Sequence, residues 1–262
     1  MLRGRRDAGG DRRGAHRTRL VRSGGRTGPV IVADTSDASR VFGVHGTEGL
    51  TYWKCLARRT GTAGSWEAVE WASLPPGAVS GVHLHTRTEE IYFVLAGTGE
   101  LSLDGTARPV GPGSIALTRA GSTHGLRNTG AEDLDWLVVE MSTPATHAVL
   151  TGTPASRERR EGMRSKVYDL ARAGEIDPSE VFDGPLSLVR TLQLDAGEER
   201  KLLADGAEHV VFVLAGSGAA ESPAGHASLT PGTSVTLPLG GRLTLRADQE
   251  GLRVFHAVLE VR

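Results

Sequence analysis

Cysteine is almost absent from this chain, and its scarcity excludes two classes of small domain. Cys55 is the single cysteine among 262 residues, so neither an intramolecular disulfide framework nor a cysteine-rich zinc site can form. Long apolar runs are missing as well. None approaches the ~18–20 residues of a membrane-spanning helix, and the first residues lack the apolar core of a secretory signal. We therefore predict a cytoplasmic protein without a membrane partner.

The chain also has almost no net charge. The formal net charge is −1 at pH 7, which gives no electrostatic reason to expect a nucleic-acid partner. The positive charge gathers in residues 1–28, which hold nine arginines, two aspartates and almost no apolar residues. Such a composition cannot offset the entropy lost on ordering, so we predict a disordered tail. A basic arm for nucleic acid or anionic lipid, and a translated leader foreign to the native protein, are the alternatives.

Turn-forming residues, in contrast, are abundant. The chain holds 35 glycines and 12 prolines, against only 5% aromatic residues. This composition favours many short strands and tight turns over long helices. We predict an all-β fold, and the length permits one large domain or two small ones.

Residues 77–128 carry the clearest chemical signal. His83 and His85 are two apart in an expected strand, so both imidazoles point to one face, about 7 Å apart along the backbone. Glu90 opens the next expected strand, and a hairpin would return it to the histidines. His124 begins a later strand just after a glycine turn at Gly121. Three imidazoles and one carboxylate suit one divalent transition metal, which can be Fe(II), Mn, Ni, Co, Cu or Zn, and the softness of the donors does not choose among them.

Two spaced motifs in this stretch resemble those of the cupin superfamily. The first, G-x5-HxH-x3–4-E-x6-G, is matched without a gap by Gly77, His83, His85, Glu90 and Gly97. The second, G-x5-PxG-x2-H-x3-N, is matched by Gly113, Gly121, His124 and Asn128, with Arg119 in place of the usual proline. The resemblance implies a double-stranded antiparallel β-barrel with the metal in its mouth.

The second half of the chain repeats the first with a shift of 119 residues. FVLAGTG at residues 93–99 returns as FVLAGSG at residues 212–218, and Pro-Gly at 112–113 returns at 231–232. At this shift, Leu202, His209 and Leu243 stand at ligand positions of the first half, so the metal motif is lost. We predict a bicupin, with two such barrels in one chain and a metal only in the first.

The expected organisation follows from this repeat. A tail covers residues 1–28, a metal-binding barrel residues 29–145, a polar linker residues 146–166 and a degenerate barrel residues 167–262. The second barrel is expected to act as a packing partner that stabilises the first. We expect a monomer or a homodimer.

The resemblance implies a metal-dependent enzyme acting on a small oxygenated organic acid or metabolite, and dioxygenase or isomerase chemistry is preferred over decarboxylase or lyase chemistry. Tyr92 shares the expected face of Glu90 and is a candidate to orient substrate or donate a proton, and Arg119 is a candidate to attract a carboxylate. The alternatives are ordinary polar histidines on a sandwich, a purely structural metal, and a non-enzymatic cupin of storage or sensor type that binds a small ligand.

Removal of residues 1–28 tests the interpretation of the tail. A chain that starts at Pro29 should keep the melting temperature and metal content of the full chain, because the removed segment has almost no apolar surface to bury. The measurement is differential scanning calorimetry beside metal analysis. A clearly lower melting temperature or metal content would give the segment a structural role.

Overall fold

The protein is built mostly of β-sheet in this computed structural model, which describes residues 29–154 and 162–261. The prediction of an all-β fold is confirmed in this coarser form, since the helices are few and short. The expected tail, residues 1–28, and residues 155–161 of the expected linker lie outside the described residues. No helix in the described ranges is long and apolar enough to cross a membrane.

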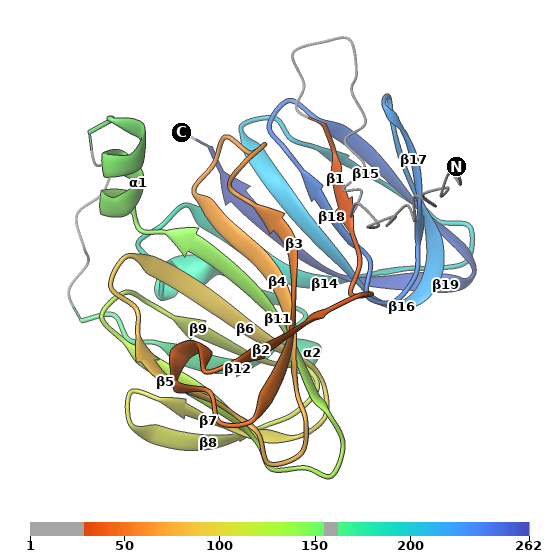
Figure 1. Ribbon diagram of the computed structural model, residues 1–262. Helices are drawn as coiled ribbons and strands as arrows, with labels where there is room; N and C mark the ends of the chain where they lie inside the picture. Colours follow the sequence, from red (N-terminus) through yellow and green to blue (C-terminus); the bar gives the residue numbers. More distant parts are fainter. Residues whose placement is uncertain (1–28, 155–161, 262) are drawn as a thin grey trace, which may run out of the picture.

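The first half consists of two sheets that face each other (Figure 1). The larger sheet has the order β12-β9-β6-β11-β4-β3-β2, and its strands are β2 (Ser39–Phe42), β3 (Leu50–Arg58), β4 (Trp66–Leu74), β6 (Thr88–Ala96), β9 (Ser114–Thr118), β11 (Leu134–Ser142) and β12 (Lys166–Asp169). The smaller sheet has the order β5-β10-β7-β8, with β5 (Val79–Leu84), β7 (Gly99–Leu103), β8 (Thr106–Val110) and β10 (Thr123–Asn128). Leu74 and Trp136 of the larger sheet share a buried core with Leu101 and Leu126 of the smaller.

The second half forms one sheet of eight strands, which wraps around its own core. Its main path is β1-β18-β16-β19-β14-β13, with β15 added to β19 and β17 to β16. The strands are β1 (Ile31–Ala33), β13 (Glu175–Ile176), β14 (Leu186–Leu194), β15 (Glu199–Leu203), β16 (Ala207–Ser222), β17 (Gly225–Leu229), β18 (Ser234–Leu237) and β19 (Arg242–Glu260). Hydrogen bonding among the described strands closes no barrel in either half, so the two-barrel arrangement stays a prediction.

The helical elements lie in the connections. They are η1 (Val44–Gly46), α1 (Pro144–Thr151), α2 (Leu170–Ala173) and η2 (Pro178–Glu180). α1 falls largely inside the expected linker, and its ends follow ordinary capping rules. Thr143 accepts a hydrogen bond from the Thr146 amide, Pro144 opens the first turn, and Gly152 ends the helix in a left-handed conformation with φ 70°.

The repeat predicted from the sequence recurs in the strand register. His83 pairs with His124, and Leu202 pairs with Leu243; each residue of the second pair lies 119 positions after its counterpart. Leu202 and Leu243 are both buried in the core of the second half, so apolar side chains occupy the positions that carry imidazoles in the first half.

The two halves exchange strands. β1 precedes the first half in sequence but pairs with β18 of the second half, and β12 begins at the end of the expected linker but pairs with β9 of the first half. In Figure 1, β1 accordingly lies among the C-terminal strands. The expected boundaries at residues 29, 145 and 167 therefore do not separate the strands of one sheet from those of the other.

A reciprocal pair of buried carboxylates links the halves. Glu89 accepts hydrogen bonds from the amides of Asp183 (2.7 Å) and Gly184 (2.8 Å), across from the first half to the second. Glu208, which follows Glu89 by 119 residues, accepts from the amides of Ala63 (2.7 Å) and Gly64 (2.9 Å) in the opposite direction. We call these four contacts the carboxylate clasp.

Two of the four donor amides of this clasp belong to glycines, which allow the carboxylates to approach closely. A Cβ added at Gly184 would lie 2.7 Å from a Glu89 carboxylate oxygen, and one added at Gly64 would lie 2.8 Å from a Glu208 oxygen. Both distances are too short for a carbon and an oxygen that are not bonded. A carboxylate of the first half therefore packs against a glycine of the second, and a carboxylate of the second against a glycine of the first.

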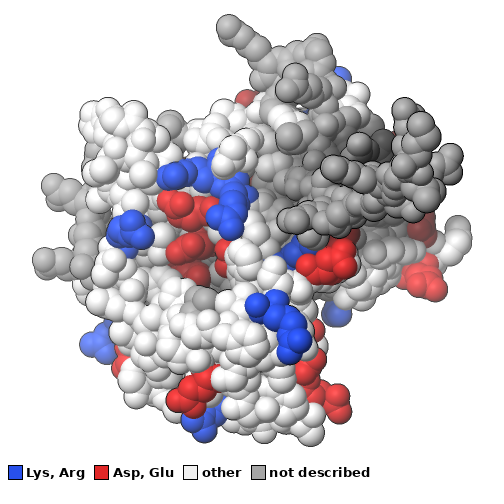
Figure 2. Space-filling view, in the orientation of Figure 1, with Lys and Arg blue, Asp and Glu red and all other residues white. Residues whose placement is uncertain are grey.

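Charged side chains are scattered over one face of the molecule. On the face shown in Figure 2, Lys and Arg lie in small groups interspersed with Asp and Glu, without a continuous basic patch. The absence of a nucleic-acid partner stays a prediction.

Substitution of Glu208 by Gln tests the clasp. Glu208 also accepts from the Leu239 amide at 3.0 Å, and an NH2 group in place of one oxygen would leave buried amides without an acceptor. We expect Glu208→Gln to lower the free energy of unfolding by about 2–4 kcal/mol. Glu221→Gln, an exposed position on the same strand, should change it by less than about 0.5 kcal/mol. Urea denaturation measures both, and equal effects would argue against the clasp.

Candidate metal centre

Four side chains from both sheets of the first half converge on one point. His83 lies on β5, His85 directly after it, His124 on the neighbouring strand β10, and Glu90 on β6 of the larger sheet. Their ligating atoms all lie within 4.8 Å of one another. The expected alternation holds on β5, since Val82 and Leu84, between and beside the histidines, are exposed on the outer side.

The expected hairpin between these strands is wrong. β5 pairs with β10 in the smaller sheet, whereas β6 lies between β9 and β11 in the larger one. The turn after His85 therefore crosses from one sheet to the other. Glu90 therefore approaches the histidines from the facing sheet. The four candidate ligands meet between the two sheets, with side chains from both.

The distances fit a single ion. Nε2 of His124 lies 3.1 Å from Nε2 of His85 and 3.2 Å from Nε2 of His83. The Glu90 carboxylate lies 2.8 Å from Nε2 of His124 and 3.2 Å from Nε2 of His85. Two donor atoms bound at about 2.1 Å in adjacent octahedral positions would be about 3.0 Å apart. The cluster can therefore hold a transition metal.

The other ring nitrogen of each histidine is held by a neighbour. Nδ1 of His83 donates to the Gly81 carbonyl at 3.0 Å, so its Nε2 presents a lone pair to the cluster. Nδ1 of His85 lies 3.1 Å from the Thr88 hydroxyl, and Nδ1 of His124 lies 2.7 Å from the Thr118 hydroxyl. Such outer contacts fix ring orientation in metal sites.

Burial and mutual contact set the protonation of the cluster. Burial lowers the pKa of His83 to about 4. Burial acts to raise the pKa of Glu90, but hydrogen bonds from His124 and His85 outweigh it and lower this pKa to about 2. For His85 burial acts downward, yet the hydrogen bond and charge of Glu90 prevail and raise its pKa. An anionic Glu90 thus favours any cation at this point, whether a proton or a metal ion.

A cavity of about 330 Å³ opens beside Glu90. Tyr92, Trp53 and Trp136 form much of its wall. The Tyr92 ring centroid lies 4.1 Å from that of His124. Burial raises the pKa of Tyr92 well above its usual value, so the phenol stays protonated and serves as a hydrogen-bond donor. The cavity has the size of a small-molecule site.

Comparison with known proteins agrees with this geometry. Residues 70–140 match the cupin domain. This match supports the resemblance to the cupin superfamily. An oxalate-binding protein from Thermotoga maritima is 29% identical over 113 residues, which cover 43% of this chain and 93% of that protein.

Two solved structures extend the similarity of fold beyond the cupin domain. Protein Ylba from E. coli has a TM-score of 0.70 at 12% identity, with 91% of this chain and 96% of that one covered. A variant of the Bacillus subtilis oxalate decarboxylase has a TM-score of 0.62 at 13% identity, with 87% and 76% covered. At these identities the likeness concerns the fold alone.

Three polar residues beside the four candidate metal ligands were missed by sequence reasoning. The His45 ring stacks on His83 with centroids 4.2 Å apart, and both Glu70 and Glu140 lie within electrostatic reach of Glu90. Burial, followed by the charge of Glu90, raises the pKa of Glu140 to about 7. The available signal for Glu70 and Glu140 was an acidic residue among mainly apolar neighbours in a strand. No sequence signal pointed to His45, because its contact with His83 depends on how η1 packs over Gly81.

Gly81 permits the approach of η1. A Cβ at this position would clash with the carbonyl oxygens of His45 and Gly46. His45 itself has a left-handed backbone, with φ 51°, which is uncommon for a residue with a side chain. The close contact between η1 and β5 therefore holds the His45 ring beside the cluster.

Arg119 is not among the described residues that line the cavity beside Glu90. It is buried, and its guanidinium binds Asp183 at 2.7 Å and the Met163 carbonyl at 2.7 Å. A role in binding a carboxylate substrate stays a prediction without geometric support, whereas these contacts hold the first half to the second. Tyr92 lines the cavity, and its catalytic role also stays a prediction.

The equivalent region of the second half holds a histidine pair. Nδ1 of His209 lies 3.0 Å from Nε2 of His256, and Nε2 of His209 lies 3.0 Å from the Leu203 carbonyl. Arg190 donates through Nε to Nδ1 of His256 at 3.2 Å. Because Arg190 only donates and a carbonyl only accepts, the chain of bonds runs one way and both rings are neutral.

The histidine pair predicts a loss of stability in acid. Burial lowers the pKa of His256 to about 3 and also lowers the pKa of His209. In the unfolded chain these rings bind protons at about pH 6.5, so stability is fully present above that pH and falls as the pH drops toward 3. His256→Gln should flatten the fall by a few kcal/mol. Exposed His226→Gln is the control, and equal slopes in urea denaturation from pH 7 to 4 would contradict the argument.

Proposed function

We propose that this chain is a metal-dependent cupin enzyme that acts on a small oxygenated organic acid or metabolite, by dioxygenase or isomerase chemistry. The metal ligands are His83, His85, Glu90 and His124. The observation that carries the proposal is the convergence of four ligating atoms within 4.8 Å, at the wall of a cavity of about 330 Å³.

The donor set defines what a bound metal would contribute. A divalent transition metal on three imidazoles and one carboxylate supplies Lewis-acid polarisation of a chelating oxygen and, with Fe(II), a redox centre. Fe(II) is our first choice, with Mn, Ni, Co, Cu or Zn as alternatives. The four-ligand set leaves room for a substrate oxygen in an octahedral arrangement, in contrast to a closed structural site.

The chain's own residues orient the substrate. The indole NH of Trp136 and the hydroxyl of Thr51 are buried at this cavity without a hydrogen-bond partner among the described residues. Both can donate to oxygens of a bound molecule, as can the protonated Tyr92. No Lys or Arg belongs to the described lining, so these neutral donors and the metal would have to stabilise an anionic substrate.

The rest of the chain fits a supporting role in this proposal. The 119-residue register of the two halves, and a solved structure matched over 91% of the chain, support two related cupin units. We propose that the second stabilises the first and holds no metal at Leu202, His209 and Leu243. The protein would be a cytoplasmic monomer or homodimer.

A second candidate is a non-enzymatic cupin that binds a small ligand. It is favoured by the oxalate-binding protein of Thermotoga maritima, which is 29% identical over 113 residues. In this case the metal would hold oxalate or a similar chelating acid without turnover. The cavity is larger than oxalate requires, which favours the first proposal.

Metal analysis of the purified chain tests the centre. We expect about one metal ion per chain, and loss of most of it in the His83→Ala/His85→Ala double variant, because two of four ligands are removed. Glu90→Gln should bind metal at least tenfold more weakly, whereas Glu100→Gln, at an exposed position, should not. Unchanged metal content in the double variant would overturn the assignment.

Turnover separates the two candidate functions. The metal-loaded protein is incubated with a panel of hydroxy acids, keto acids, aromatic acids and oxalate, with and without dioxygen, and products are followed by mass spectrometry. Turnover that is lost in the double variant supports the enzyme. Calorimetric binding of oxalate with no product from any compound supports the second candidate.

A further inference from the structure

A second cavity lies at the seam between the halves. It has a volume of about 610 Å³, against about 330 Å³ for the cavity beside Glu90. Phe93 and Leu95 reach it from β6, and they point to the opposite face of that strand from Glu90 and Tyr92. The seam cavity is therefore separate from the metal centre, and its role is independent of the proposed function.

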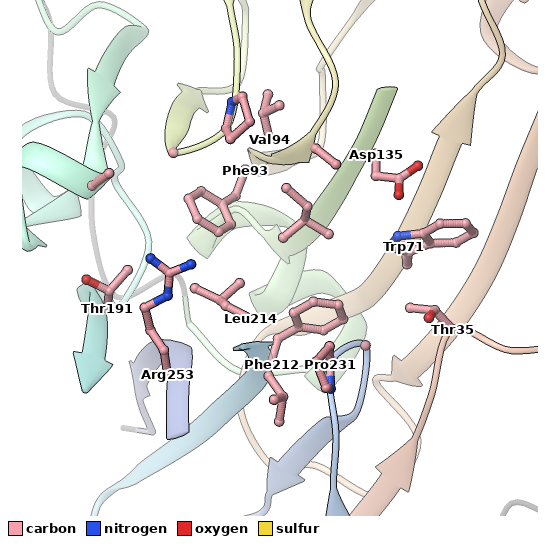
Figure 3. Close-up of a pocket in the computed structure, with 17 residues that line it drawn as sticks. Thr35, Trp71, Phe93, Val94, Asp135, Thr191, Phe212, Leu214, Pro231 and Arg253 are labelled. Atoms are coloured by element: carbon pink, nitrogen blue, oxygen red, sulfur yellow. The ribbon is translucent and has the colours of Figure 1, made fainter. Parts of the chain in front are cut away.

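The two walls of this seam cavity are copies of each other. Phe93, Val94 and Leu95 form one wall, and Phe212, Val213 and Leu214, which lie 119 residues later, form the other (Figure 3). Pro112-Gly113 and Pro231-Gly232 add the same turn from each half. A duplicated chain thus builds a cavity with an approximate twofold relation between its sides, and its middle is apolar.

The symmetry fails at one pair of charged positions. On β11, Asp135 pairs with Ala96, and on β19, Arg253 pairs with Ala215. Because Ala215 follows Ala96 by 119 residues, Asp135 and Arg253 occupy equivalent positions with opposite charge. Figure 3 shows these two side chains on opposite sides of Phe93, Leu214 and Phe212. The seam cavity is therefore acidic at one end and basic at the other.

Both charges are available to a ligand. One carboxylate oxygen of Asp135 is buried and accepts no hydrogen bond from the described residues. Asp135 has a hydrogen bond with the Ser73 side chain and the charge of Asp133 nearby, and it forms no ion pair with a cationic residue in the described ranges. Arg253 is exposed and forms no ion pair with any residue in the described ranges. A guanidinium in this state can bind a carboxylate through two parallel hydrogen bonds.

We propose that the seam cavity binds a zwitterionic amino acid with an apolar middle, its carboxylate on Arg253 and its ammonium group on Asp135. The apolar side chains between the two charges would bury the methylene chain. A dicarboxylate or a diamine would place a like charge at one end, so the cavity discriminates against both.

Calorimetry with straight-chain ω-amino acids of four, six and eight carbons tests the proposal. At least one length should bind the full chain, and the matching fatty acid and alkylamine should each bind at least tenfold more weakly, because each loses one charged contact. Arg253→Gln should weaken the amino acid and the fatty acid alike. Asp135→Asn should weaken the amino acid and spare the fatty acid.

Matched controls separate this site from general charge effects and from the metal centre. Arg246→Gln and Glu132→Gln remove a charge of the same sign on or next to the same strands, at exposed positions outside the cavity, and should bind as the parent chain does. The His83→Ala/His85→Ala variant should also bind normally, even if the proposed function fails. The proposal is overturned if no length binds below about 10 mM, if the two cavity variants bind like the parent, or if only the double histidine variant loses binding.

Discussion

The carboxylate clasp is the interaction on which the arrangement of the two halves depends. A buried carboxylate is unfavourable unless hydrogen bonds compensate for its lost hydration. Both donors to Glu89 are backbone amides of the opposite half, and Glu208 accepts from two such amides besides the Leu239 amide of its own half, so neither carboxylate would keep all its donors in its own half alone. Together with the exchanged strands β1 and β12, this makes the halves interdependent in the folded state.

The sequence predicted what depends on local spacing. The alternation of a strand places His83 and His85 on one face, and the constant shift of 119 residues reappears as the register of Leu202 with Leu243. Errors arose where distant segments decide the outcome. The turn after His85 crosses between sheets instead of forming a hairpin. The contact of Arg119 with Asp183, which lies 64 residues away, likewise had no signal in the sequence. Spacing along one strand carries no information about which sheet the next strand joins.

The two halves also show that equivalent positions need not keep equivalent chemistry. Where the first half places imidazoles, the second places Leu202 and Leu243 in an apolar core. At the position of Glu90, His209 instead joins His256 and Arg190 in a one-way chain of hydrogen bonds. Each half therefore buries a polar group at this point of the sheet. In the first half, Glu90 contacts the imidazoles of His85 and His124. In the second half, His209 hydrogen-bonds to His256 and to the Leu203 carbonyl.

Because the two halves have diverged, the cavity between them can carry different charges at its two ends. Two identical halves would place the same charge at both ends of the cavity between them, and like charges facing one apolar space would repel. Asp135 and Arg253 have instead taken opposite signs at equivalent positions, while Phe93 and Phe212 remain the same. The shared apolar wall keeps the halves packed, since Phe93 stacks on Phe255 at 5.1 Å, whereas the charged ends are free to differ. The two halves thus keep the same apolar side chains at the centre of the seam cavity, where they pack together, and differ in charge at its ends.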